Sequence, residues 1–348
     1  MKILFISNMY PSKQKSYAGI FIKNQFEELQ NIISNDDSLE IFYMKRAFTS
    51  KIGSLLKYSF AFVRFMPNLF KRFDIIHVHY FYPLILLAWL NKKLHKKTKI
   101  VVTFLGRDIN SQVNKRNQFF FRKIANEVDF SIPVGVTLSS QIKKKLDLDE
   151  MKIIPCGVND RIFYKEESVL KVYDFIMVGS FIHRKGIDTV IKAIKLLPKN
   201  TDIKFCFCGS GNYLVELENL QKDYNITIKQ NQTQNQLREL LNASRFFLLM
   251  SRAEGFATAT TEAFFCGVPV LTSDIDNFKE QVEEGVNGYT SQLGNEKLLK
   301  ENFLKLKSLS AKKYNQLADG ANTSFKSASL HKVCLQIYEI YKNLNSVQ

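Results

Sequence analysis

The feature that most constrains this chain is a repeated alternation between short apolar runs and longer segments with helical spacing. Each run is three to five residues long and rich in aliphatic and aromatic side chains. Because an apolar run of this kind suits a strand buried on both faces, the pattern predicts parallel sheets covered by helices. We expect strands at residues 2–6, 75–78, 99–102, 130–132, 152–154, 174–178, 204–207, 226–228, 246–249 and 268–271.

The length of 348 residues exceeds what one hydrophobic core usually serves, so we expect two domains. A charged stretch at 165–168 interrupts the apolar pattern just before a new unit of strand, turn and helix begins. The sequence therefore predicts two Rossmann-like, doubly wound α/β domains, at residues 1–168 and 169–325. A last helix at 326–348 should pack back on the first domain. Ligands of such sheets bind beyond the carboxyl ends of the strands.

Basic residues are concentrated in the N-terminal half. Residues 1–168 hold 27 lysines and arginines against 15 aspartates and glutamates, within a chain whose net charge is +16. A surface this basic is expected to meet an anionic partner, and nucleic acid, an anionic membrane leaflet and a phosphorylated acceptor all qualify. Charge alone does not choose among them.

Three simpler features narrow the class of protein. The opening residues lack the pattern of a signal peptide, and the most apolar stretch, 83–90, is too short to span a bilayer. The five cysteines include no C-x-x-C pair, so neither disulfides nor a zinc site is expected. We therefore expect a cytoplasmic protein, with a peripheral position on the inner face of the membrane as a further possibility.

The most informative motif reads EGFATATTEA, from Glu254 to Ala263, and precedes GVPV at 267–270. Its small residues follow a predicted strand and begin a helix. The first N–H groups of a helix have no partner within the helix, and the helix dipole favours anions there, so residues 255–258 suit a diphosphate. Glu262 follows two turns later on the same side, where its carboxylate suits the hydroxyl pair of a ribose.

Two glutamates separated by seven residues, the first in EGF and the second before AxxxGxPV, resemble the signature of glycosyltransferase family 4, the retaining enzymes of the GT-B fold. Other motifs extend the resemblance over nearly the whole chain. They are IPCGVN at 154–159, VGSFIHRKGID at 178–188, FCGSG at 207–211 and GVNGY at 285–289. The resemblance implies two Rossmann-like domains with the active site in the cleft between them.

The resemblance also implies how the site works. The N-terminal domain would bind the acceptor, and the C-terminal domain would bind a nucleotide-sugar donor. Lys185, Gly19 and the amides of Gly255, Phe256, Ala257 and Thr258 would hold the donor diphosphate, Gly209 would lie beside the nucleoside, Glu262 would bind the ribose, and Glu254 would contact the transferred sugar. Glycine suits position 19 because a Cβ would block the approach of the backbone to the diphosphate.

Two positions depart from the family pattern. Ser180 stands where the family has a phosphate-binding arginine, and Arg184 is the candidate replacement in the same donor-binding loop. Leu105, in the segment TFLGRD, stands where many members present a histidine to the sugar, whereas Asp108 is retained. Because the donor phosphate itself can serve as the base in a retaining enzyme of this kind, we still expect activity, with Glu254 and Asp108 as the catalytic residues.

The implied reaction moves a hexosyl-type sugar from a nucleotide-diphosphate sugar, such as a UDP-sugar, to a glycan or lipid-linked acceptor in bacterial cell-surface polysaccharide or glycolipid synthesis. No cofactor and no metal are expected. His77 and His79 share one face of a strand but have no third ligand at a suitable spacing. The D-x-D at 274–276 follows a strand that should not reach the donor phosphates.

Two other functions compete with this interpretation. A nucleotide-sugar epimerase can share the architecture, and a basic chain can serve as a nucleic-acid-binding module. The paired glutamates favour the transferase, and no nucleic-acid partner is expected. Residues 51–73 mix large apolar and basic side chains, which suits an ordinary domain helix and an anionic membrane surface equally well. Pro67 argues against one uninterrupted helix there, and the oligomeric state stays open.

Overall fold

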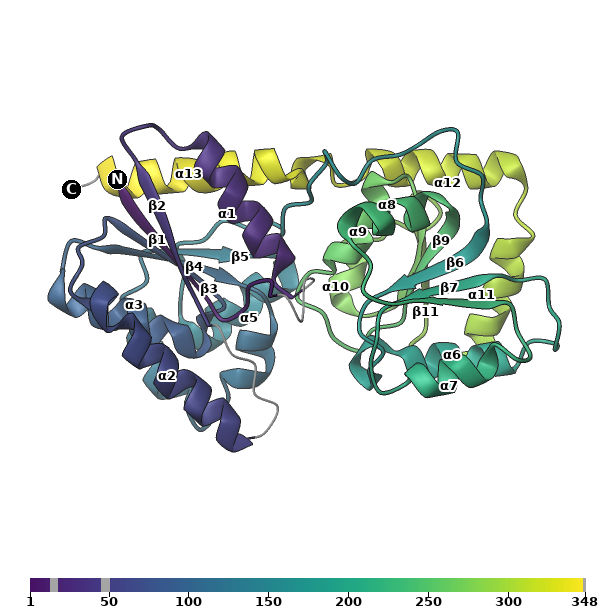
Figure 1. The fold of residues 1–348 in the computed structure, drawn as a ribbon, viewed down its shortest axis with the longest axis horizontal. Helices are drawn as coiled ribbons and strands as arrows, with labels where there is room; N and C mark the ends of the chain where they lie inside the picture. The colour runs from purple at the N-terminus through teal and green to yellow at the C-terminus, as the bar shows by residue number, and fades with distance from the viewer. Residues whose placement is uncertain (13–17, 45–50, 347–348) are drawn as a thin grey trace. The chain divides into compact units, whose positions relative to one another are not determined.

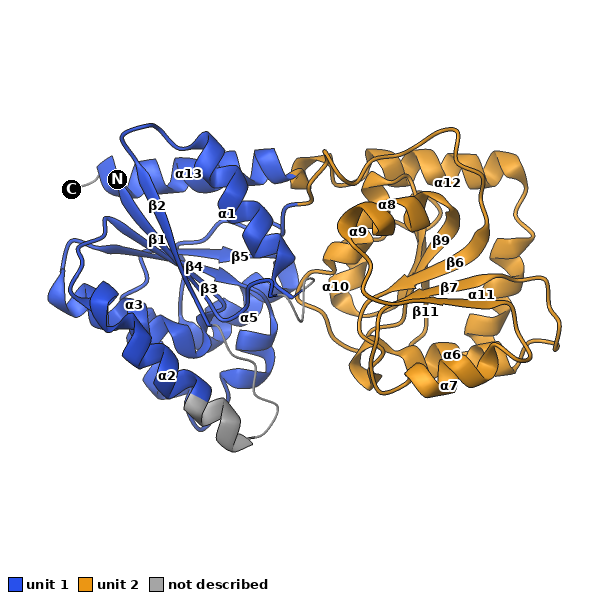
Figure 2. Cartoon of the chain, in the orientation of Figure 1, with its two compact units in different colours: residues 1–157, 330–348 blue, residues 158–329 orange. Residues whose placement is uncertain are grey.

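The computed structural model describes residues 1–12, 18–44 and 51–346, without the side chains of residues 51–56. The chain divides into two compact units, Met1–Gly157 with Leu330–Gln348 and Val158–Ser329 (Figure 2). The sequence placed these divisions at 168 and 325. They fall at 157 and 329 because the Val158 N–H donates to the Ala328 carbonyl, and because Phe163 packs into the core of the second unit.

The first unit is built on a five-stranded sheet in which all neighbouring strands run parallel. The strand order is β2-β1-β3-β4-β5, with β1 at Lys2–Ser7, β2 at Ser38–Tyr43, β3 at Ile75–His79, β4 at Lys99–Phe104 and β5 at Phe130–Pro133. Its helices are α1 (Ile20–Ile32), α2 (Lys51–Leu69), α3 (Phe81–Leu94), α4 (Gln118–Ala125), α5 (Val136–Leu146) and α13 (Leu330–Ser346). Figure 1 shows α1 and α13 on one face of this sheet and α2 and α3 on the other.

The final helix α13 belongs to the first unit although it follows the second in sequence. Its residues Val333, Ile337 and Tyr341 are buried in one cluster with Ile3 and Phe5 of β1. Because α13 completes the apolar cover of this sheet face, the first unit needs both ends of the chain for its core.

Two expectations about the first unit are wrong. Residues 152–154 form no strand, and only Met151 makes a bridge, to Ser131. Helix α2 continues through Pro67 to Leu69. Proline removes one backbone hydrogen bond, the one to the Val63 carbonyl. Because Pro67 lies only two residues before the end of α2, little of the helix depends on that bond.

The second unit contains a six-stranded parallel sheet of order β11-β10-β9-β6-β7-β8. Its strands are β6 (Tyr173–Val178), β7 (Phe205–Cys208), β8 (Ile226–Lys229), β9 (Ser244–Leu249), β10 (Val270–Ser273) and β11 (Gly288–Ser291). Its helices are α6 (Ile187–Lys195), α7 (Leu214–Leu220), α8 (Gln234–Asn242), α9 (Thr258–Phe265), α10 (Asp276–Lys279), α11 (Glu296–Lys307) and α12 (Ala311–Thr323). The predicted parallel sheets are confirmed in both units.

The strand order of the second sheet fixes where a ligand should bind. Strand β6 lies between β7 and β9, so the chain reverses its direction of travel across the sheet at β6. The loops after β6 and β9 therefore begin side by side at the carboxyl edge, the position at which doubly wound sheets bind ligands. In the part of the chain that the structure describes, no helix has the length and hydropathy needed to cross a bilayer.

Candidate active site

The loops after β6 and β9 bring together three residues predicted from the motifs, Arg184, Lys185 and Glu254. Two contacts of Arg184 join the loops directly. The Arg252 N–H donates to the Arg184 carbonyl at 2.8 Å, and Nη1 of Arg184 donates to the Ala253 carbonyl at 2.9 Å. The basic residues of one loop are thus held against the first glutamate of the other.

Glu254 is a buried carboxylate with strong donors around it. Its Oε1 accepts hydrogen bonds from Lys185 Nζ and from Ser251 Oγ, both at 2.6 Å. Nη1 of Arg184 lies 3.6 Å from the other oxygen, Oε2. The Ser251 hydroxyl is itself buried, and the Ser251 carbonyl accepts a hydrogen bond from the Ser273 hydroxyl at the end of β10. Glu254 is therefore fixed through Oε1, while Oε2 keeps accepting capacity.

Helix α9 begins at this loop and leaves backbone donors free. Among the described residues, no hydrogen-bond acceptor faces the N–H groups of Phe256, Ala257, Thr258 or Ala259. The helix dipole adds partial positive charge at the same place. An anion placed here would satisfy donors that the described part of the chain leaves without partners.

Two side chains support this loop from the rear. Asn277 Nδ2 donates to the Gly255 carbonyl at 3.2 Å, and Gln281 Nε2 donates to the Ala257 carbonyl at 3.4 Å. The Gln281 carbonyl in turn accepts from Asn287 Nδ2 at 3.0 Å. The GVNGY segment thus contributes by holding the α9 loop in place, because its asparagine secures Gln281.

Glu262 lies in the second turn of α9 and is partly buried. Its carboxylate makes no hydrogen bond or ion pair with any described residue. Burial raises its pKa to about 8, since a carboxylate removed from water without a partner favours the neutral form. Such a group is costly unless a ligand supplies donors, and sugar hydroxyls are suitable donors.

The remaining predicted residues of the second unit line the same edge. Ser180 is exposed in the loop after β6. Gly209 follows β7, where a Cβ would stand 1.9 Å from the Gly179 carbonyl oxygen. At Gly186 a Cβ would stand 1.7 Å from the Met250 carbonyl oxygen. Only glycine permits these approaches, so the loops after β6, β7 and β9 are packed backbone against backbone.

Gly19 and Asp108 lie in the first unit. Gly19 precedes α1 with φ of 74°, and a Cβ there would stand 2.9 Å from the Met9 carbonyl carbon. Asp108 is fully buried and accepts hydrogen bonds from the N–H groups of Phe81 at 3.0 Å and Ile109 at 3.2 Å. Burial raises its pKa to about 6 despite these hydrogen bonds. Asp108 therefore joins the start of α3 to the segment after β4.

The two histidines of β3 are enclosed in the core of the first unit. His77 Nε2 lies 2.8 Å from Thr103 Oγ1, and His77 Nδ1 bonds to the Tyr341 hydroxyl. Burial lowers the pKa of both, that of His79 to about 3. Over the described ranges, no three His, Cys, Asp or Glu side chains gather as a metal site would require.

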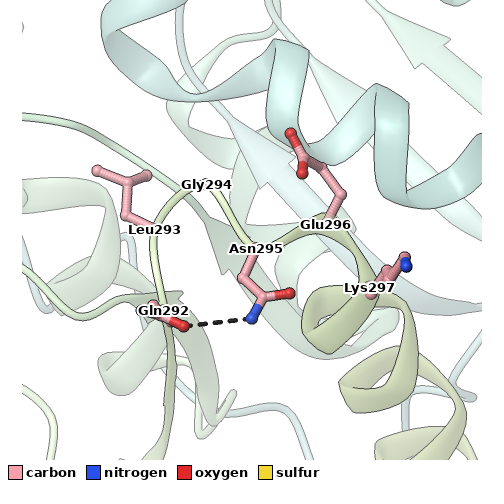
Figure 3. Close-up of a pocket in the computed structure, with 6 residues that line it drawn as sticks. All are labelled: Gln292, Leu293, Gly294, Asn295, Glu296 and Lys297. Carbon is pink, nitrogen blue, oxygen red and sulfur yellow. Dashed lines mark hydrogen bonds between the residues drawn. The ribbon is translucent and has the colours of Figure 1, made fainter.

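The D-x-D segment supports a loop of the second unit. Asp274 accepts a hydrogen bond from the Leu293 N–H at 2.9 Å, and Asp276 pairs with Lys279. The loop that Asp274 secures, residues 292–297, lines an open polar pocket of about 350 Å³ (Figure 3). None of the residues predicted from the motifs lines it.

Family models match both units. A model described as Glycosyl transferases group 1 matches residues 158–323, and one described as Glycosyltransferase Family 4 matches residues 34–161. The chain belongs to glycosyltransferase family 4. The resemblance seen in the motifs at 254–263 and 178–188 is thereby confirmed. Of the three functions considered, the transferase is favoured over the epimerase and the nucleic-acid-binding module.

Known relatives of this glycosyltransferase agree with that membership. It is 26% identical to an uncharacterized glycosyltransferase of Methanocaldococcus jannaschii, with 99% of each chain aligned. It is 29% identical to the capsular polysaccharide biosynthesis glycosyltransferase CapH of Staphylococcus aureus, over 73% of this chain and 72% of the relative. The structure of Anabaena HepE with UDP and glucose has a TM-score of 0.76 at 16% identity, over 99% and 100% of the two chains. That likeness confirms the GT-B fold.

Three residues of this site, Ser251, Arg252 and Ser273, were not predicted from the sequence. Ser251 and Arg252 stand directly before the recognised EGF segment, so they could have been found by asking what holds its glutamate. Ser273 is distant in sequence and reaches the site only because β10 pairs with β9.

Proposed function

We propose that this glycosyltransferase moves a sugar from a nucleotide-diphosphate sugar to a glycan or lipid-linked acceptor with retention of anomeric configuration. The observation that carries the proposal is the edge of the second sheet. Free amides, two basic side chains and a carboxylate without partners among the described residues meet there, in the loops after β6 and β9 and the first two turns of α9. This set matches the phosphate, ribose and sugar parts of such a donor.

The diphosphate would lie at the start of α9, against the free N–H groups of Phe256 to Ala259. Lys185 can bridge Glu254 and a phosphate oxygen, because an ammonium has three donors and Glu254 uses one of them. Arg184 is about half exposed, which leaves donors of its guanidinium available to a second phosphate oxygen. Arg184 would thus supply the charge that Ser180 lacks.

Glu262 would accept both ribose hydroxyls. No described residue competes for its carboxylate, so the ribose would relieve the cost of its burial. The donor base is not decided by these contacts. The UDP and glucose bound by Anabaena HepE make a UDP-sugar the first candidate to test.

Glu254 would act on the transferred sugar through Oε2, the oxygen that its buried contacts leave available. As the bond between the anomeric carbon and the diphosphate oxygen breaks, positive charge grows on the sugar, and a fixed carboxylate stabilises it. The acceptor oxygen then bonds to the same face of that carbon. Its proton passes to the departing diphosphate, which serves as the base.

Two predicted residues of the first unit receive different roles in the proposal. Asp108 would be a positioning residue, because its oxygens are buried and engaged by backbone N–H groups. Gly19 would let the segment after β1 approach a ligand closely, as its left-handed conformation and its contact with Met9 require glycine there.

The acceptor is proposed from the relatives alone. CapH is named for capsular polysaccharide biosynthesis, which makes a glycan or a lipid-linked glycan the expected class. Such an acceptor would bring the enzyme to the inner face of a membrane. No metal is proposed, since the basic loop and the α9 amides can neutralise the diphosphate.

A thermal-shift series with UDP, GDP and their sugars in excess EDTA tests the donor site. One nucleoside diphosphate should raise the melting temperature without metal, because a ligand of the native state stabilises it by mass action. Absence of any shift, or a shift only after Mg²⁺ is added, would contradict the donor site or its independence of metal. Turnover should release nucleoside diphosphate and yield a product whose NMR coupling reports the donor's anomeric configuration. Isomerised donor without release would indicate an epimerase.

A further inference from the structure

Helix α2 is apolar on two opposite faces. Ala61 and Phe65 are buried at 2% exposure each and pack toward the first unit. On the other side Val63 is 67% exposed and Met66 is 48% exposed, and Phe70, which directly follows the helix, is 68% exposed. A helix covered by only one neighbouring layer normally turns polar residues outward. The outer face of α2 therefore carries apolar side chains that the core of the first unit does not use.

Helix α4 repeats this arrangement on a smaller scale. Phe121 and Ile124 are buried, whereas Phe119 is 72% exposed and Phe120 is 52% exposed. Lys123 Nζ lies 4.6 Å from the centre of the Phe119 ring. Two neighbouring exposed phenylalanines are unusual on a protein surface unless a partner covers them.

Both helices pack on α3, so their outer residues belong to one rigid body. Asn91 of α3 donates through Nδ2 to the carbonyls of Asn68 and Leu69 at the end of α2. The ring of Tyr82 at the start of α3 lies 5.0 Å from that of Phe121 in α4. Figure 1 shows α2 and α3 along the same side of the first sheet.

Basic residues outnumber acidic ones around these side chains, although Lys71 pairs with Glu40 and Arg122 pairs with Asp147. Residues 51–73 contain five lysines and arginines and residues 109–126 contain four, and neither segment contains an aspartate or glutamate. Lysines and arginines beside exposed phenylalanines suit a surface with anionic headgroups above an apolar layer. An acidic protein would match the charges, but it offers no apolar layer at a fixed depth for two separate helices.

We propose that Val63, Met66, Phe70, Phe119 and Phe120, termed the α2/α4 face, insert into the headgroup region of an anionic bilayer. Lys115, Arg116, Lys123 and Arg72 then contact lipid phosphates. The membrane contact goes beyond the transfer reaction, because it needs neither the donor loops nor a bound nucleotide. It would also bring the acceptor-binding unit to the surface that holds a lipid-linked acceptor.

Vesicle flotation of the full chain tests the α2/α4 face. The protein should float with vesicles of mixed phosphatidylglycerol and phosphatidylcholine. It should remain in the bottom fraction with vesicles of phosphatidylcholine alone, or at high salt. The double variant F119S/F120S should reduce partitioning at least about tenfold, as two large apolar side chains no longer insert. Neutralising Lys115 with K115Q should weaken it about fivefold, because one basic side chain near such a surface contributes about 1 kcal/mol.

Matched controls distinguish membrane binding through the α2/α4 face from nonspecific adsorption of exposed apolar side chains. Val215 on α7 is 66% exposed, and V215S should float like the unaltered protein. The thermal shift of F119S/F120S with a nucleoside diphosphate should be unchanged, so failure of the donor site and failure of membrane binding are distinguishable. Unaltered flotation of F119S/F120S would overturn the proposal. So would a lack of binding to anionic vesicles, or a dimer in light scattering that this variant dissociates.

Discussion

The guanidinium of Arg252 and the carboxylate of Asp188 form a two-point ion pair, with both N to O distances at 2.8 Å. Arg252 follows β9, and Asp188 lies in the first turn of α6. Burial of Asp188 raises its pKa, but the hydrogen bonds and charge of Arg252 outweigh this and hold that pKa below its usual value. Arg252 also donates to the His183 carbonyl. One side chain thus links the loop that carries Lys185 to the loop that carries Glu254.

Replacing Arg252 with lysine should weaken nucleoside diphosphate binding about tenfold, because lysine cannot form the planar pair with Asp188 and the basic loop loses its register. Isothermal titration of the variant measures the change. The control is K195Q, which removes an exposed pair with Glu216 in the same unit and should bind normally. Unchanged affinity in R252K would show that the Arg184 contacts suffice to hold the loop.

Ser251 should matter for turnover more than for donor affinity. Its hydroxyl donates to Glu254 Oε1, so S251A frees the carboxylate to rotate and should lower kcat about tenfold with little change in KM for the donor. S251T restores the donor and should recover most of the rate. A purely structural role for Ser251 would instead lower the melting temperature of both variants and leave kcat of the folded enzyme intact.

Glu262 should bind the ribose at a cost to the stability of the unliganded protein. We expect E262Q to lose about a hundredfold in nucleoside diphosphate affinity, since a charged acceptor of two hydroxyls is replaced. The same variant should be more resistant to urea at pH 8, because the buried carboxylate no longer needs to ionise. Normal affinity in E262Q would remove Glu262 from the donor site.

The difference in urea stability between the unaltered protein and E262Q should change with pH in a defined direction. The pKa of Glu262 is about 8 in the folded chain, against an ordinary value of 4.5, so the folded state holds the proton more strongly. The stability contribution of Glu262 is full below pH 4.5 and is lost as pH rises to about 8. The urea stability of the unaltered protein should therefore fall relative to E262Q across that window. A constant difference between the two proteins would contradict the raised pKa.

The D108N variant should show whether Asp108 positions its segment or takes part in catalysis. D108N should reduce the free energy of unfolding by about 2 kcal/mol, because its amide nitrogen would face the backbone N–H of either Phe81 or Ile109. Nucleoside diphosphate affinity should stay within about twofold, since the contacts proposed for Lys185, Arg184 and Glu262 belong to the other unit. Chemical denaturation and titration measure the two effects. A loss of turnover at full stability would instead make Asp108 a catalytic residue.

Most strands that could be predicted from the sequence are buried on both faces, although the edge strands β5 and β8 were predicted too. β2 and β11 were missed because Ser38–Tyr43 alternates apolar with polar residues and Gly288–Ser291 contains no aliphatic side chain. The run at 152–154 lies beside β5, where the Lys152 and Ile154 N–H groups donate to the Ser131 and Pro133 carbonyls. Only Met151 makes a bridge, so the run does not form a regular strand.

The residues of the candidate site also differ in how well the sequence predicts them. Residues that would touch a ligand carry motifs, so Lys185, Glu254 and Glu262 could be named from the resemblance of those motifs to the family. Those that hold them act through contacts between segments distant in sequence. Arg252 meets Asp188 across 64 positions, and Ser273 meets Ser251 across 22. No spacing rule within a single segment encodes such pairs.

The crossing of Gly186 with the Met250 carbonyl limits how this donor site can be re-engineered. Because there is no room for a Cβ at Gly186, the loops after β6 and β9 cannot be redesigned independently at that point. A chimera that imports only one loop from another transferase would have to reproduce the same crossing. Donor specificity is therefore best exchanged as one cassette from β6 through α9, within which exposed positions such as Ser180 can be varied freely.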